Sequence, residues 1–177
     1  MLRLIFVFCF TFLLSISGYT QSRYWIASVA SDWSSDNWAS TSGGAPDGGG
    51  PPTGLENAIF DGNGIANCNV DITASFSGLV VNNYTGVIDI NGNSFTTAGT
   101  VTLNSGTIND TPGTSELTIN STGVATFNGT TLGADVNCSA DGIDFEGSTF
   151  NGDFVGVKQE TLITMVLEEI LLMEVSL

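Results

Sequence analysis

The sequence predicts an all-β protein that winds as a parallel β-helix (β-solenoid). A short unit recurs, made of an apolar residue, a Thr, Asp or Asn, a second apolar residue and an Asn/Gly turn. The chain also holds 22 glycines, and only 12% of its residues are charged. Each unit directs two apolar side chains to one face of a strand, and stacking such short strands builds a continuous core. The copies are Ile88–Ile90, Val101–Leu103, Leu117–Ile119, Ala125–Phe127, Val136–Cys138 and Ile143–Phe145, with rougher copies at Val70–Ile72 and Leu79–Val81.

Residues 1–20 are expected to be a secretory signal peptide. Arg3 supplies the basic start, Leu4–Leu14 is apolar, and the small and polar residues that follow suit cleavage before Gln21. The apolar run is shorter than the about 20 residues that a spanning helix needs. We therefore expect a secreted, extracellular or cell-surface protein with no membrane span after cleavage.

Residues 21–61 are expected to form an N-terminal cap. The segment contains all three tryptophans, Trp25, Trp33 and Trp38, and a Gly/Pro-rich loop. A solenoid must cover its first coil, because that coil would otherwise expose apolar surface and free strand edges. A sugar-binding platform of aromatic side chains is the alternative role for these tryptophans.

Several of these features resemble the start of autotransporter-associated β-strand-repeat proteins, which are exported bacterial surface proteins. That family shows a progression of W-x-N-W, Pro, A-x-F, V-x-L and G-L-x-V. The matching residues are Trp33, Trp38, Pro46, Asn57–Phe60, Val70–Ile72 and Gly78–Val81. The resemblance covers residues 24–156 and implies a right-handed parallel β-helix with an adhesin-like role. It brings no catalytic residues, and this chain lacks the family's long run of coils and its C-terminal anchoring domain.

Residues 62–156 hold the predicted repeats and two cysteines, Cys68 and Cys138. In an oxidising compartment the two could pair as a disulfide, or both could remain free in the core. Each lies at or beside a repeated apolar position, which favours free thiols.

Residues 157–177 differ from the repeats because they contain no Gly, Asn or Asp and are rich in Leu, Ile, Met, Val and Glu. The apolar residues recur at helical spacing, which predicts an amphipathic helix. A frameshift is the second interpretation. Codons for residues 158–177, read two bases later, can spell Thr-Gly-Asp-Ala-Asn-Tyr-Asn-Gly-Val-Gly-Gly-Asn-Thr-Phe-Asn-Gly-Gly-Phe-Ser. That peptide has the composition of the repeats, so the chain would be a truncated version of a longer repeat protein.

Composition and motifs argue against most chemistry. Residues 21–156 hold fourteen acids and one base, Arg23, which disfavours binding to nucleic acid. The chain has no His, so no Ser-His-Asp or Cys-His arrangement can form. Asp61–Gly64 begins like a calcium loop but lacks its later ligands, so we expect a turn there. We predict no catalytic residue, metal site or cofactor, although the carboxylates permit weak Ca²⁺ binding.

The predicted function is a non-enzymatic, structural and adhesive repeat region of a bacterial cell-surface protein. Surface glycans or other cell-surface components are the expected partners. The alternative is a secreted β-helix protein that binds or cleaves carbohydrate, because polysaccharide lyases share this architecture.

Overall fold

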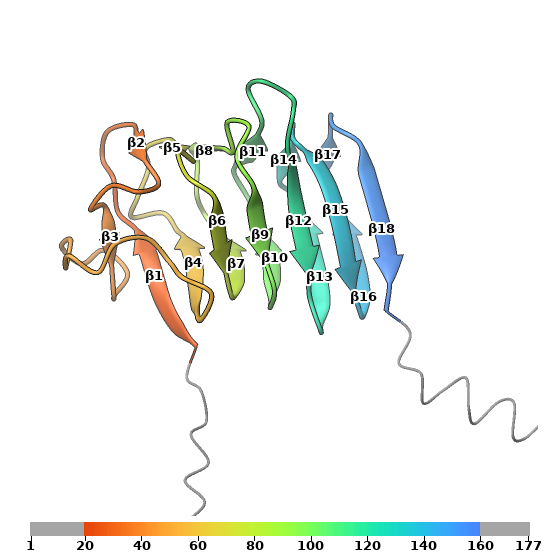
Figure 1. The fold of residues 1–177 in the computed structure, drawn as a ribbon, viewed down its shortest axis with the longest axis horizontal. Coiled ribbons are helices and arrows are strands. Elements are labelled where there is room, and N and C mark those ends of the chain that lie inside the picture. Colours follow the sequence, from red (N-terminus) through yellow and green to blue (C-terminus); the bar gives the residue numbers. More distant parts are fainter. Residues whose placement is uncertain (1–19, 160–177) are drawn as a thin grey trace, which may run out of the picture.

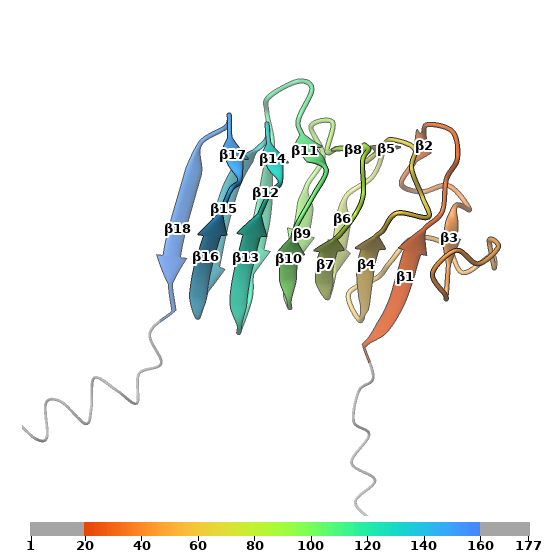
Figure 2. The ribbon, with the colours of Figure 1, turned by 180° about the vertical axis from the view of Figure 1, so that it is seen from behind.

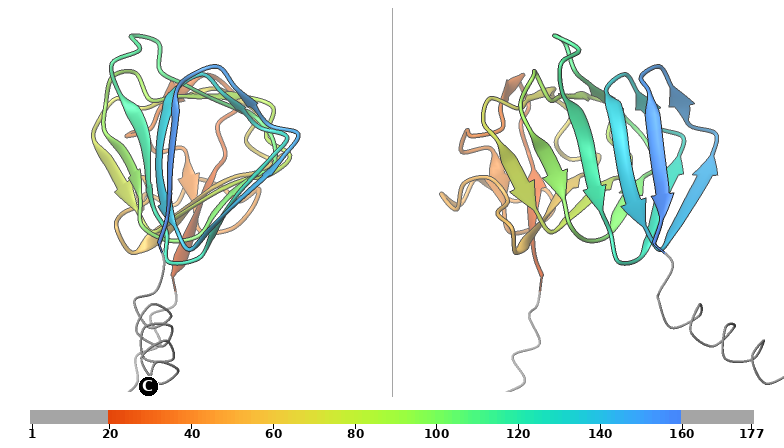
Figure 3. Two further views of the ribbon diagram at one scale, coloured as in Figure 1. Left: turned by 90° about the vertical axis from the view of Figure 1, so that its right-hand side faces the viewer. Right: turned by 45° about the vertical axis from the view of Figure 1, so that its right-hand side comes forward.

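The predicted β-helix is confirmed by a computed structural model that describes residues 20–159. Three parallel sheets form the sides of a triangular prism (Figure 3). The chain runs up one side at the back and down another at the front while it advances along the axis, which is a right-handed winding (Figures 1 and 2). The predicted leader and most of the atypical tail lie outside the described residues.

The strands follow the chain coil by coil. Coil 1 holds β1 (Gln21–Trp25), β2 (Ser31–Asp32) and the short β3 (Trp38–Ala39). Coil 2 holds β4 (Glu56–Phe60), β5 (Cys68–Asn69) and β6 (Ala74–Phe76). Coil 3 holds β7 (Gly78–Val81), β8 (Val87–Asp89) and β9 (Phe95–Thr97). Coil 4 holds β10 (Val101–Leu103), β11 (Thr107–Asn109) and β12 (Glu116–Asn120). Coil 5 holds β13 (Val124–Asn128), β14 (Thr131–Leu132) and β15 (Asp135–Ala140). Coil 6 holds β16 (Gly142–Glu146), β17 (Thr149–Phe150) and β18 (Phe154–Lys158).

Each coil contributes one strand to each sheet, except that coil 1 lacks the third side. Sheet A has the order β16-β13-β10-β7-β4-β1-β3, sheet B has β17-β14-β11-β8-β5-β2, and sheet C has β18-β15-β12-β9-β6. All neighbours are parallel except β1 and β3, where Trp25 pairs with Trp38. Equivalent residues are therefore stacked from coil to coil, as the recurring unit predicts.

The core lies on the axis of the prism and is filled by the apolar residues of the recurring unit. In β12, Leu117 and Ile119 are fully buried while Thr118 between them faces outward. Burying such a side chain contributes about 1.5–3 kcal/mol. The prediction of a strand at Val70–Ile72 is wrong, because β5 ends at Asn69 and the chain turns a corner there. Val70 is still buried, whereas Ile72 is 42% exposed.

The last step along sheet A is shorter than those before it. Leu79 pairs with Val101 and Val101 with Ala125, which are steps of 22 and 24 residues. The next step, from Ala125 to Ile143, is 18 residues. Glycines with positive φ make several of the turns, including Gly106 at 71° and Gly147 at 65°. Other residues adopt that backbone conformation only with strain.

Candidate functional site

The three tryptophans predicted as cap or ligand-contact residues lie inside the first coils. Trp25, Trp33 and Trp38 are each at most 1% exposed. The ring centroids of Trp33 and Trp38 are 4.8 Å apart with an interplanar angle of 69°, and Trp33 also packs edge-on against Phe95 at 5.2 Å. Burial leaves these rings no open face on which a sugar could stack. Residues 21–61 supply coil 1, the long loop after β3 and the first strand of coil 2.

Buried Arg23 forms an ion pair with Asp47, an exposed residue, and this pair ties the loop after β3 to β1. Its guanidinium donates to both carboxylate oxygens of Asp47, at 3.1 and 2.8 Å, and to the carbonyl oxygen of Gly50. Arg23 is 5% exposed. Its hydrogen bonds, with that from the Gly49 amide, hold the pKa of Asp47 well below its usual range. The one base in residues 21–156 therefore holds the fold together at this end.

Cys68 and Cys138 are both free and buried. Cys68 lies in β5 of sheet B, whereas Cys138 lies in β15 of sheet C, three coils further along. Burial, together with the nearby carboxylates of Asp71 and Asp32, raises the pKa of the Cys68 thiol. Burial raises the pKa of Cys138 to about 11. Both thiols act as small core residues, because thiolate formation is disfavoured.

A row of carboxylates and amides runs along the outside of sheet B. We call it the sheet-B ladder, and its members are Asp32, Asn69, Asp89 and Asn109, which pair in register on successive coils. The Asn69 amide donates a hydrogen bond to the Asp32 carboxylate at 2.8 Å.

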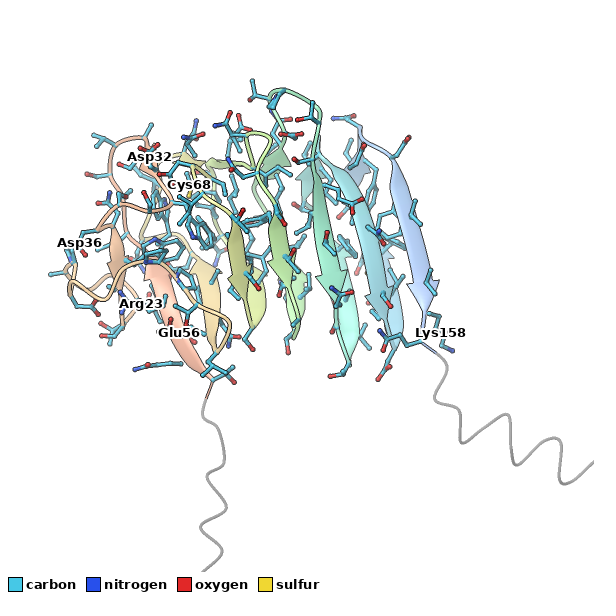
Figure 4. All side chains as sticks on the ribbon, in the orientation of Figure 1. Arg23, Asp32, Asp36, Glu56, Cys68 and Lys158 are labelled. Atoms are coloured by element: carbon cyan, nitrogen blue, oxygen red, sulfur yellow. The ribbon has the colours of Figure 1, made fainter. Side chains whose placement is uncertain are left out.

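A shallow groove of ≈ 340 Å³ lies beside the sheet-B ladder. Ladder residues line it together with Ser31, Asn67 and Val87. Figure 4 shows Asp32 and Cys68 near the same corner of the rod. The ladder is a polar contact surface that spans coils 1 to 4.

Several acids serve the turns. Asp89 accepts hydrogen bonds from the amides of Asn91 and Thr111 and from the Thr111 hydroxyl. Asp110 is 7% exposed and accepts bonds from the amides of Gly92, Thr114 and Ser115, at 2.6 to 2.7 Å. Sequence reasoning missed the role of Asp110. The Asp-Thr-Pro-Gly run around it is a turn signal that could have indicated it.

Within residues 20–159, no group of three or more acids or cysteines is arranged to hold a metal ion. Asp61 caps its own turn, because its carboxylate accepts bonds from the Asn63 amide and the Ser42 hydroxyl. The same part of the chain contains no helix long and apolar enough to cross a membrane.

Comparisons with protein-family models, with curated proteins and with solved structures found no match for this chain.

Proposed function

We propose that residues 21–156 are a structural and adhesive repeat region of a protein exported to the bacterial cell surface. The observation that carries the proposal is the in-register stacking of five complete coils behind an aromatic first coil. Such a rod repeats the same outward side chains at the spacing of neighbouring strands, about 4.8 Å. It presents a long surface with little mobile chain, which suits a spacer or an adhesin.

The sheet-B ladder is the proposed contact surface. It alternates carboxylates and amides. Carboxylates accept hydrogen bonds from the hydroxyl groups of sugars, and amides both donate to and accept from them. Surface glycans are therefore the proposed partners. The groove beside the ladder favours a second candidate function, that of a β-helix protein that cleaves the polysaccharide it binds. The experiment below separates the adhesive function from the cleaving one.

The purified full chain is applied to an array of bacterial and host polysaccharides and glycans. Asn69→Ala removes a ladder amide bonded to Asp32, and its matched control, Asn137→Ala, removes an outward sheet-C amide bonded to Glu116. We expect retention on the array, lowered about fivefold or more by Asn69→Ala and unchanged by Asn137→Ala. Thermal melts of both variants exclude unfolding as the cause.

New reducing or unsaturated chain ends in the array supernatant would overturn the non-enzymatic proposal in favour of the second candidate. Absence of retention on every surface would contradict the adhesive role. Equal loss of retention in both variants would move the contact surface away from the ladder.

A further inference from the structure

Three phenylalanines form the inner surface of the last coil. Phe145, Phe150 and Phe154 lie on β16, β17 and β18, one on each side of the prism. Their rings contact one another, with centroids 5.1 to 5.4 Å apart. The residues that pair with them one coil earlier are Phe127, Leu132 and Val136. Those three are at most 1% exposed, whereas Phe145 is 50% exposed and the other two are half-buried.

The same coil forms the free edge of all three sheets. Strands β16, β17 and β18 are each last in their sheet, so one side of each lacks a neighbouring strand among the described residues (Figure 3). Unpaired strand edges combined with exposed aromatic rings are what one more coil would cover. Coils 2 to 5 each receive that cover from the coil that follows them.

The register of the last coils shows where one more coil would begin. Phe145, Phe150 and Phe154 each follow their partners by 18 residues. An equal step places Met165 at the turn position of Gly147, where φ is 65°. It also places Glu168 at the inward position of Phe150. A long side chain in a left-handed turn and a charge in the core are both unfavourable, so the sequence of residues 160–177 as translated does not match the repeat.

The peptide read two bases later does continue the repeat. The junction Met165–Val166 forces a glycine in that frame, and it falls 18 residues after Gly147. Around it, Asp-Ala-Asn-Tyr-Asn-Gly aligns with residues 142–147, so that its Ala and Tyr take the inward positions of Ile143 and Phe145. Codon degeneracy permits these residues, whereas the glycine holds for every choice of codons.

The second and third sides of the coil align as well, after three additional residues in the turn. Thr-Phe-Asn-Gly-Gly-Phe matches Thr149–Phe154, with Phe at both inward positions. Its first glycine is forced by the junction Met173–Glu174 and aligns with Gly152. A Cβ at Gly152 would lie 2.5 Å from the carbonyl oxygen of Ala134, so that position requires glycine. Both forced glycines therefore fall where the last coil needs glycine.

We propose that the end formed by β16, β17 and β18 is a stacking surface for one more coil of the same solenoid. We further propose that codons 158–177, read two bases later, encode that coil. The inference rests on packing and register and does not depend on the adhesive role proposed above.

The test compares three full chains: the chain as given, a chain in which the shifted-frame peptide replaces residues 158–177, and a chain carrying that peptide in scrambled order. Hydrogen exchange of the β16 and β18 amides and binding of an apolar-surface dye are measured. We expect the shifted-frame peptide to slow exchange about tenfold or more and to reduce dye binding, relative to both other chains. Equal exchange with the ordered and scrambled peptides would overturn the proposal. So would slow exchange in the chain as given, because its own tail would then cover this end.

A matched pair of substitutions locates the effect. In the chain with the shifted-frame peptide, Phe145→Ala should restore fast exchange in β16, whereas Val29→Ala, at a 70% exposed position in coil 1, should not. The nucleotide sequence tests the origin of the peptide independently. Codons that give His or Asn at the position of its Tyr, or a stop at the position after its Val, would overturn the second part of the proposal.

Discussion

Trp25 and Tyr84 donate hydrogen bonds to the same atom, the carbonyl oxygen of Ala66. The indole nitrogen lies 2.9 Å from it and the phenol oxygen 2.7 Å. Both side chains are at most 1% exposed. Because Trp25 lies in coil 1 and Tyr84 in coil 3, this one carbonyl links three successive coils through the core. Burial also raises the pKa of the Tyr84 phenol, which keeps it a hydrogen-bond donor at ordinary pH.

Tyr84→Phe should lower the free energy of unfolding by about 0.5–1.5 kcal/mol, because it removes one buried hydrogen bond and leaves the ring in place. Urea unfolding followed by tryptophan fluorescence measures the change. Tyr24→Phe, on the outer side of β1, is the matched control and should be close to neutral. Equal effects of the two substitutions would show that the shared carbonyl contributes nothing specific.

The Arg23–Asp47 pair predicts a loss of stability in acid. Unfolded Asp47 titrates near its ordinary pKa of 3.8, whereas the folded carboxylate titrates well below it. The stabilisation from the ionised Asp47 carboxylate is therefore complete above about pH 5. It is lost as the pH falls towards the pKa of Asp47 in the folded protein. Urea midpoints at pH 7 and pH 3 should differ less for Asp47→Asn than for the unaltered chain. Asp36→Asn, an exposed acid at the edge of the rod (Figure 4), should leave the difference unchanged.

Gly64 lies against the backbone of β1. A Cβ at this position would contact the carbonyl of Trp25 and would lie 2.9 Å from the amide nitrogen of Ile26. Gly64→Ala should therefore destabilise the protein by about 1–3 kcal/mol. Gly54, whose added Cβ would meet nothing within 4 Å, provides the control. A thermal melt in which the two alanine variants coincide would refute the close packing of this turn on coil 1.

The two core thiols should be protected in the folded protein. Cys68 and Cys138 are buried, and burial raises the pKa of each. A thiol reagent at pH 8 should label both only after unfolding, and reductant should not change the unfolding midpoint. Mass mapping identifies the labelled positions. A Cys68–Cys138 cross-link in the unreduced chain would contradict the structure.

The recurring triplet predicted the architecture because its period-2 pattern is local. Leu117–Ile119 and Ala125–Phe127 lie in β12 and β13 with the polar residue outward. The corners were less predictable, since the same pattern at Val70–Ile72 continues through a bend. Contacts distant in sequence were not predictable at all. Arg23 and Asp47 lie 24 residues apart in sequence, and Asp47 belongs to a Gly/Pro-rich loop whose path no local pattern specifies.

The phenylalanines of the last coil show the same limit. They lie five and then four residues apart, a spacing that by itself fits either a five-residue repeat or a turn motif. In the structure, Phe145, Phe150 and Phe154 mark the three sides of one 18-residue coil. The strand register with the preceding coil distinguishes the two interpretations. The spacing of the phenylalanines alone does not show that register.

Hydrogen exchange measured strand by strand on the full chain tests most directly whether the rod is closed at its first coil and open at its last. We predict the slowest exchange in β4, β7 and β10, which are paired on both sides beside the aromatic core. We predict exchange about tenfold or more faster in β16 and β18, which open locally because one side of each is unpaired among the described strands. Equal protection in β16, β18 and the central strands would contradict an open end.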